Sequence, residues 1–167
     1  MASIGPSIKP LDTKPNRDLT ATHFENLTLR FITACHDIQD PTNLLLIRRH
    51  CAPVVQTEGQ NPGEFVPNAS ALSGEDYISH LQNYKARYPT WSVEIDTSTA
   101  DLDAAGRAAV VWAVLVANES EKAEKVVSRR ETMYRMFWRW KGTKAEGTWA
   151  WWRCEPIDGA PGRLWWD

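Results

Sequence analysis

The apolar residues in the first part of the chain have a helical period. Apolar side chains recur three or four positions apart along one face of a segment: Phe24, Leu27, Phe31, Ala34 and Ile38. This spacing predicts an amphipathic helix over about 22–37. Thr22 and Glu25 have the spacing of a capping box at its start.

Two further helices are marked by their capping residues. Asp40 suits an N-cap and Pro41 the first helical position, so a second, short helix is expected there, which Pro53 ends. Ser73 and Asp76 form a capping pattern for a third helix, which the next proline ends. This third helix carries an aromatic and apolar stripe: Tyr77, Leu81, Tyr84 and Tyr88.

After the third helix the sequence becomes typical of strands. Four segments rich in Val, Trp, Thr and Tyr are separated by turn residues: 91–98, 107–118, 126–140 and 148–156. A short β-prone run over 54–58 precedes them, and the long loop over 59–72 could act as a lid over a site. The pattern predicts an α+β domain with three helices packed on one face of a strongly curved, mostly antiparallel sheet.

Along the longest expected strand, alternation divides the side chains between two faces. One set is expected to face the interior: Thr132, Tyr134, Met136, Trp138 and Trp140. The other set is expected outside: Glu131, Met133, Arg135, Phe137 and Arg139. Arg129, Arg135 and Arg139 fall on the outer set, which is typical of a solvated or subunit-facing surface. No nucleic-acid partner is therefore expected.

Composition and charge fit one globular domain. The chain has 167 residues, is 43% hydrophobic and has a formal net charge of −2, so no overall field attracts nucleic acid or an acidic membrane. No stretch has the features of a signal peptide or the length of a membrane span, so we expect a cytoplasmic protein with no membrane partner. The predicted organisation is a flexible arm over 1–19, a single domain over 20–158 and a tail over 159–167. The tail is tryptophan-rich and either docks on the domain or contacts a partner subunit.

Several short stretches occur in a characteristic order. They are the first-helix exit over 35–40, the Cys-Ala-Pro-Val-Val junction over 51–55, the third-helix start over 74–76, its exit over 86–91 and the closing pair of strands. Over about 22–156 this order resembles the nuclear transport factor 2-like (NTF2-like) superfamily, in the branch of SnoaL-like polyketide cyclases and ketosteroid isomerase. The resemblance implies a cone-shaped domain with a ligand pocket in its mouth, and a homodimer formed through the outer sheet face.

The resemblance also implies positions for acid–base chemistry. Glu58 falls at or within one residue of the place where the isomerase carries its carboxylate base, and Tyr134 falls where it carries an oxyanion-stabilising acid. A carboxylate in an apolar cavity can exchange a proton near neutral pH, and a phenol can donate a hydrogen bond to an enolate. His36 and His80 are the histidines most able to face the pocket, where they would assist proton transfer. From the residues alone, Glu58 is equally well explained as a solvated residue at the end of a strand. For each histidine, a surface or capped-core position is favoured over a catalytic one.

The nine tryptophans suggest a hydrophobic ligand pocket, although any single one could serve packing. The candidate substrate-binding residues are Tyr84, Trp112, Thr132, Met136, Trp138 and Trp151. The three cysteines, Cys35, Cys51 and Cys154, are an odd number and are expected to be reduced and mostly buried. No zinc spacing, phosphate loop or nucleophile motif is present, so no metal and no cofactor are expected.

These patterns lead to one functional hypothesis and two alternatives. The first is a cofactor-independent isomerase, cyclase or dehydratase of secondary metabolism that acts on an apolar polyketide- or terpenoid-like molecule. The alternatives are a non-catalytic module of the same fold, which binds a small molecule or forms dimers, and a scaffold whose interior is filled by its own tryptophan side chains.

Overall fold

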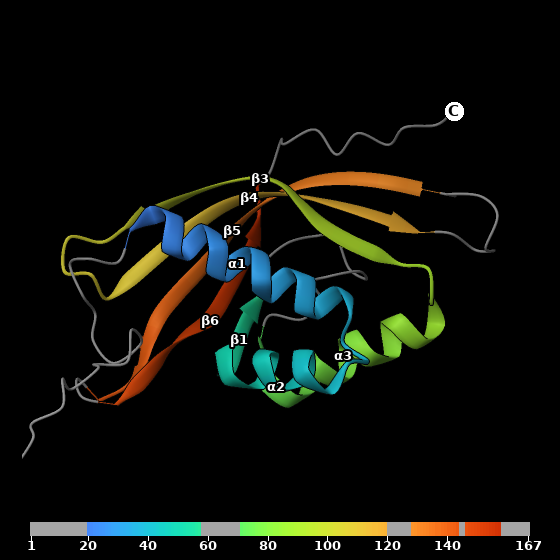
Figure 1. Ribbon diagram of the computed structural model, residues 1–167, viewed down its shortest axis with the longest axis horizontal. Helices are drawn as coiled ribbons and strands as arrows, with labels where there is room; N and C mark the ends of the chain where they lie inside the picture. The colour runs from blue at the N-terminus through green and yellow to red at the C-terminus, as the bar shows by residue number, and fades with distance from the viewer. Residues whose placement is uncertain (1–19, 58–70, 120–127, 144–145, 158–167) are drawn as a thin grey trace, which may run out of the picture.

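The structure, a computed structural model, describes residues 20–57, 71–119, 128–143 and 146–157 (Figure 1). Its elements are α1 (Ala21–His36), α2 (Pro41–His50), β1 (Cys51–Thr57), β2 (Ala71–Ser73), α3 (Gly74–Arg87), β3 (Ser92–Leu102), β4 (Ala108–Glu119), β5 (Ser128–Gly142) and β6 (Gly147–Pro156). The expected arm over 1–19, the candidate base Glu58, most of the predicted lid and the tail over 159–167 lie outside the described residues.

The helices begin at caps, two of which the sequence predicted. Asp40 Oδ1 accepts a hydrogen bond from the Thr42 backbone N–H at 2.7 Å, and Ser73 Oγ accepts one from the Asp76 N–H at 3.0 Å. The capping box at Thr22 was wrong, because the N-cap of α1 lies two residues earlier, at Thr20. Glu25 is occupied elsewhere: its Oε1 accepts the Ala100 backbone N–H of β3 at 3.1 Å. This contact ties α1 to the edge strand of the sheet.

The six strands form one mixed sheet in the order β2-β1-β6-β5-β4-β3. All neighbouring pairs are antiparallel except β1 and β6, which run parallel. Two expectations need correction here. Residues 71–72 belong to β2 and not to a loop, and Pro53 lies inside β1, since α2 already ends at His50. The β1–β6 register shifts between Cys51 and Gln56, which accommodates a proline that has no N–H to donate.

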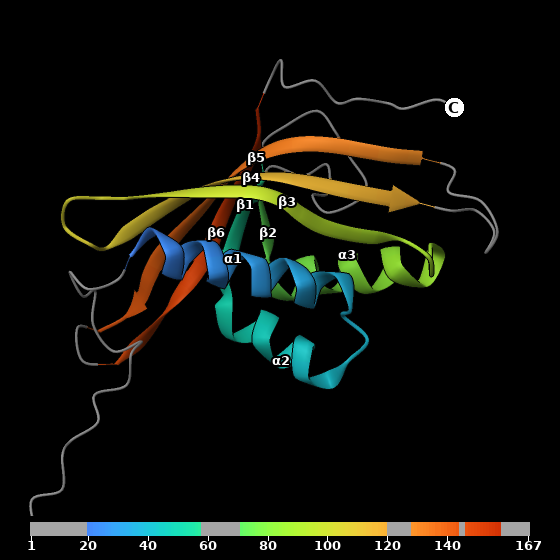
Figure 2. The same cartoon turned by 45° about the horizontal axis from the view of Figure 1, so that its top comes forward.

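All three helices lie on the same side of the curved sheet (Figure 2). The interior between them is formed from the apolar stripe of α1 and the inward side chains of the long strands. Tyr134, Met136 and Trp138 are buried, whereas Arg135 is partly and Arg139 largely exposed, so the alternation predicted for this strand is confirmed. The α+β fold class, with helices on one face of a curved sheet, is therefore present as predicted, and the sheet is not closed. No described helix has both the length and the apolar character needed to cross a membrane.

Candidate functional site

The concave face of the sheet carries five of the ten predicted site residues: Thr132, Tyr134, Met136, Trp138 and Trp151. On β5, Tyr134 pairs with Ala113 of β4, and Trp138 pairs with Ala109. Because the β4 side chains at these positions are small, the large side chains of β5 can extend over the neighbouring strand. Tyr134 is 5% exposed and Met136 and Trp138 are fully buried. The concave surface thus presents a phenol, a thioether and an indole in successive rows.

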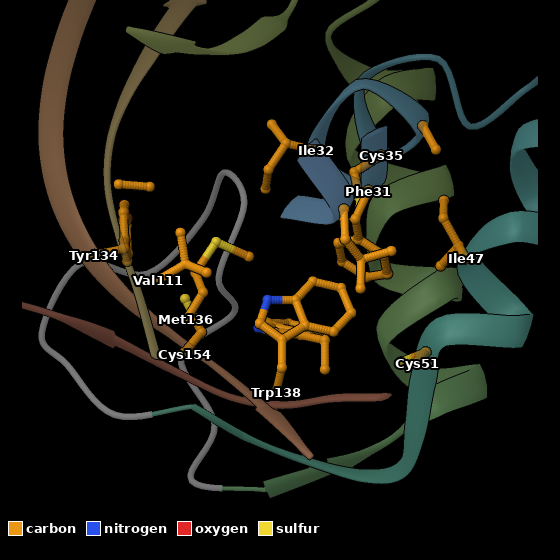
Figure 3. Packing of buried hydrophobic residues seen from close by; sticks show 14 of the residues in the cluster. Phe31, Ile32, Cys35, Ile47, Cys51, Val111, Tyr134, Met136, Trp138 and Cys154 are labelled. Atoms are coloured by element: carbon orange, nitrogen blue, oxygen red, sulfur yellow. The ribbon is translucent and has the colours of Figure 1, made fainter. Parts of the chain in front are cut away.

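The half of the concave face beside β1 is filled by four aromatic side chains, which we call the aromatic floor: Phe31, Tyr77, Trp138 and Trp151. All four have zero exposure. Phe31 packs its ring 5.6 Å from Trp138 and 5.3 Å from Trp151, and Tyr77 lies 4.9 Å from Trp151. Figure 3 shows the indole of Trp138 between Met136 and the α1 side chains. Two of the three predicted substrate-binding tryptophans, Trp138 and Trp151, therefore lie inside a packed aromatic cluster.

A hydrogen bond fixes the indole at the centre of this floor. Trp138 Nε1 donates to Thr28 Oγ1 of α1 at 2.9 Å, and both side chains have zero exposure. Thr28 was not singled out from the sequence. The signal was present, because Thr28 occupies a polar position within the apolar stripe of α1, four residues after Phe24 and three before Phe31. A polar residue there needs a partner across the interior.

Beyond the floor, the first half of β5 carries the polar groups of the concave face. Tyr134 lies two positions before Met136, and Thr132, which is half-buried, lies two positions before Tyr134. Thr132 pairs with Leu115 of β4, whose side chain is 3% exposed. A molecule held over these rows would meet a phenol and a hydroxyl at one end and the aromatic floor at the other.

The candidates on α3 belong to a second aromatic cluster. Tyr84 is half-buried, with its ring 4.8 Å from Tyr88 and 5.2 Å from Trp91, and the His80 ring lies 6.1 Å from Tyr84. Trp91 is fully buried, and its Nε1 has no hydrogen-bond partner within the part of the chain that the structure describes. The cluster joins the second half of α3 to the start of β3.

His36 lies at the end of α1, beside the same region. Burial lowers its pKa, the ammonium group of Lys85 lowers it further, and Asp37 and Glu94 oppose these effects. Lys85 in turn donates from Nζ to the Trp91 carbonyl oxygen at 2.7 Å. The imidazole of His36 is therefore held toward its neutral form, which can accept a proton.

Trp112 does not lie with the other candidates. It is 38% exposed and on the outer face, where the guanidinium of Arg135 stands 5.6 Å from its ring centroid. The residues on either side of Trp112 in β4, Val111 and Ala113, point inward and are buried. The expectation that Trp112 lines the interior was wrong, because the alternation along β4 puts it on the opposite face.

One histidine and all three cysteines are buried outside the predicted site. His50 is 5% exposed, and its Nδ1 lies 2.8 Å from the Trp149 carbonyl oxygen, so this nitrogen carries the proton. The three cysteines are free and buried, as predicted. Burial raises the pKa of Cys51 to about 12 and also raises the pKa of the other two thiols. Within the described residues, no three His, Cys, Asp or Glu side chains could hold a metal ion together.

A groove of about 230 Å³ lies outside the floor, where α2, β1 and α3 meet. Its rim carries Lys141 and the ion pair between Arg48 and Glu75, whose Nε and Oε1 atoms are 3.1 Å apart. Cys51 and Ile78 lie among its lining residues. None of the predicted site residues lines this groove, so it is separate from the concave face.

No family model matches the sequence, and no curated protein matches it. Solved structures do resemble the fold. A candidate scytalone dehydratase from Novosphingobium aromaticivorans aligns with a TM-score of 0.56 and 16% identity over 80% of this chain and 79% of that one. IdmH, a candidate polyketide cyclase from Streptomyces antibioticus, aligns with a TM-score of 0.52 and 14% identity over 80% of this chain and 89% of that one. An NTF2-like protein of unknown function from Pseudomonas putida aligns with a TM-score of 0.56 and 14% identity over 88% of this chain and 94% of that one. At these identities the likeness establishes the fold and not the activity.

Proposed function

The chain has the fold of NTF2-like proteins, and we propose that it is a cofactor-independent isomerase, cyclase or dehydratase. Its substrate would be an apolar polyketide- or terpenoid-like carbonyl compound of secondary metabolism, bound over the concave face of the sheet. The observation that carries this proposal is the placement of Tyr134, a phenol on that face with 5% exposure. A donor in such a water-poor place stabilises negative charge on oxygen more strongly than it would in water.

Each catalytic candidate would have one role. Tyr134 would donate a hydrogen bond to the oxygen of the developing enolate, and Glu58 would remove the proton from carbon. His36 or His80 would assist the return of the proton. The neutral state favoured at His36 suits it to take up the proton from the protonated carboxyl group of Glu58 before that proton is returned to the product.

The test is a pair of substitutions combined with a binding and a turnover assay. Glu58→Gln and Tyr134→Phe are compared with wild type, using quenching of tryptophan fluorescence by polycyclic and polyketide-like ketones, and kcat for any compound that reacts. An enzyme would lose about 10²–10³-fold in kcat on loss of the phenol, and about 10²–10⁴-fold on loss of the base, with affinity nearly retained. Tyr88→Phe removes a phenol from the α3 cluster and serves as the matched control.

The alternative is a non-catalytic module of the same fold. It is favoured by the aromatic floor, because part of the interior is filled by the protein's own rings. A binder would show the same fluorescence quenching without turnover. Neither substitution could then lower kcat, because wild type would have no turnover to lose. No quenching by any ketone, with turnover absent, would favour the scaffold.

We also propose a homodimer through the outer face of the sheet. On this face β3 carries the exposed acids Glu94 and Asp101, and β5 carries the exposed cation Arg139. Arg135 and Arg153 contribute less to the basic zone, because both are ion-paired with Glu155 of β6. Trp112 lies on β4 between the two charged zones. A two-fold axis along β4 would place the acidic zone of one copy over the basic zone of the other.

Sedimentation of wild type and of the Glu94→Lys, Asp101→Lys double variant tests this arrangement. The wild type should sediment as a dimer and the double variant as a monomer, because like charges would then face one another. A monomeric wild type, or a dimer that the double variant leaves intact, would contradict it.

A further inference from the structure

We propose that the indole of Trp138, held in place by Thr28, sets the depth to which a ligand can enter over the concave face. Trp138 would then be a specificity-determining residue and Thr28 the residue that positions it. This inference rests on the proposed function, since it concerns the same site. It predicts a sharp upper limit to the length of the ligand measured from the oxygen that Tyr134 binds.

The position of Trp138 on β5 gives the limit a scale. Trp138 lies four residues after Tyr134 on the same strand and the same face. At about 3.4 Å per residue their Cα atoms are separated by about 14 Å along the strand. The row between them is occupied by Met136. Ligand atoms extending from Tyr134 toward the floor therefore meet a thioether first and an indole second.

These two side chains differ in how they can respond to a ligand. Met136 has three rotatable bonds and a polarizable sulfur, so it can move aside at small cost. Figure 3 shows it between Val111 and Cys154, on the sheet side of the interior. Trp138 has only two torsions, and three neighbours hold its ring: Phe31, with centroids 5.6 Å apart, His50, at 6.3 Å, and Thr28. The methionine is adaptable, whereas the indole is fixed.

The hydrogen bond to Thr28 makes displacement of the indole unfavourable. Trp138 Nε1 and Thr28 Oγ1 are 2.9 Å apart in a place without solvent exposure. A ligand that pushed the ring away would leave a buried N–H and a buried hydroxyl without partners, a penalty that shorter ligands avoid. Affinity should therefore rise with ligand length until the indole is reached and then fall abruptly.

The experiment uses n-alkyl phenyl ketones, from acetophenone upward, titrated into the full-length protein and followed calorimetrically. In wild type, affinity should increase with each methylene up to a cut-off length. Trp138→Phe, which has a smaller ring and no N–H, should move the cut-off to longer chains and improve the first excluded ketone by about 10-fold or more. Thr28→Val should also move the cut-off to longer chains, although it removes no ring. Trp152→Phe is the matched control, because Trp152 lies on the outer face with its ring 4.8 Å from the Arg139 guanidinium.

The outcomes separate this inference from the proposed function. Binding of short ketones by wild type, with the same cut-off in both Trp138→Phe and Thr28→Val, would overturn the depth limit and leave the proposed site standing. Absence of ketone binding in wild type and in both variants would overturn the site and the depth limit together. If Trp138→Phe does not fold, Thr28→Val decides the question alone.

Discussion

The hydrogen bond between α1 and β5 allows a double-mutant cycle whose result can be worked out beforehand. Thr28→Val replaces a hydroxyl by a methyl group of nearly the same shape and leaves the Trp138 N–H buried without an acceptor. An orphaned buried donor costs about 1–3 kcal/mol. The extra buried methyl group returns less than about 1 kcal/mol. We expect the free energy of unfolding to fall by about 1–2 kcal/mol, a shift in Tm of roughly 2–8 °C for a chain of this size.

In the Trp138→Phe background there is no N–H to orphan. Thr28→Val should then change the free energy of unfolding by less than about 0.5 kcal/mol, so the coupling between the two sites should be about 1–2 kcal/mol. Urea denaturation of the four proteins measures this coupling. Thr33→Val is the control on the same helix, because Thr33 is exposed and its hydroxyl donates only to the Leu29 carbonyl oxygen, at 2.8 Å. Equal costs of Thr28→Val in both backgrounds would refute the assignment of the hydrogen bond as the source of the effect.

Two further predictions concern buried chemistry. A disulfide reagent at pH 8 should react with none of the three thiols of the native protein and with all three after denaturation, because they are buried and the pKa of Cys51 is raised to about 12. For the same reason the free energy of unfolding should fall as the pH rises above 9.0, the ordinary pKa of a cysteine thiol, because the unfolded thiols then lose protons that the folded ones keep. A free energy of unfolding that stays constant above this pH would contradict the burial of the thiols. Gly74→Ala should lower the free energy of unfolding by about 1–2 kcal/mol, because its Cβ would lie 2.8 Å from the Ala52 carbonyl oxygen and this overpacking outweighs the gain in helix propensity. Gln82→Ala, at an exposed site of the same helix, should be neutral in the same urea titration, and a stabilised Gly74→Ala would show that β1 and α3 can separate freely.

The elements that the sequence predicted well are those with a local chemical signal. The apolar stripe placed the first helix at 22–37, against 21–36 in the structure, and Asp40 and Ser73 are N-caps as predicted. The failures lie where a long-range contact decides. β2 has three residues and exists because it pairs with β1, and Glu25 bonds to β3 in place of the start of its own helix. Neither contact can be read from neighbouring residues.

The same distinction applies to the site. From Glu131 onward the charged residues of β5 all fall on one set of alternate positions, Glu131, Arg135, Arg139 and Lys141. The inward position of Tyr134 could therefore be predicted from the period of two. β4 is an almost continuous apolar run over 108–117, which contains no alternation to show which face is inward. Trp112 was therefore assigned by residue type alone, and its face was wrong. Thr28 was missed for the opposite reason, since its role depends on a partner 110 positions away in the sequence.

The register of β5 and β6 connects the two faces of the sheet. The pairing shifts between Phe137 and Trp138, which keeps Trp138 opposite Trp151 on the inside. The residue that follows Trp151, Trp152, points outward, where the Arg139 guanidinium stacks on it. Without this bulge, the aromatic floor and the outer cations could not both keep their faces, because a slip of one residue exchanges the two sides of a strand. The depth of the proposed site and the charge of the proposed dimer surface therefore depend on the same local irregularity.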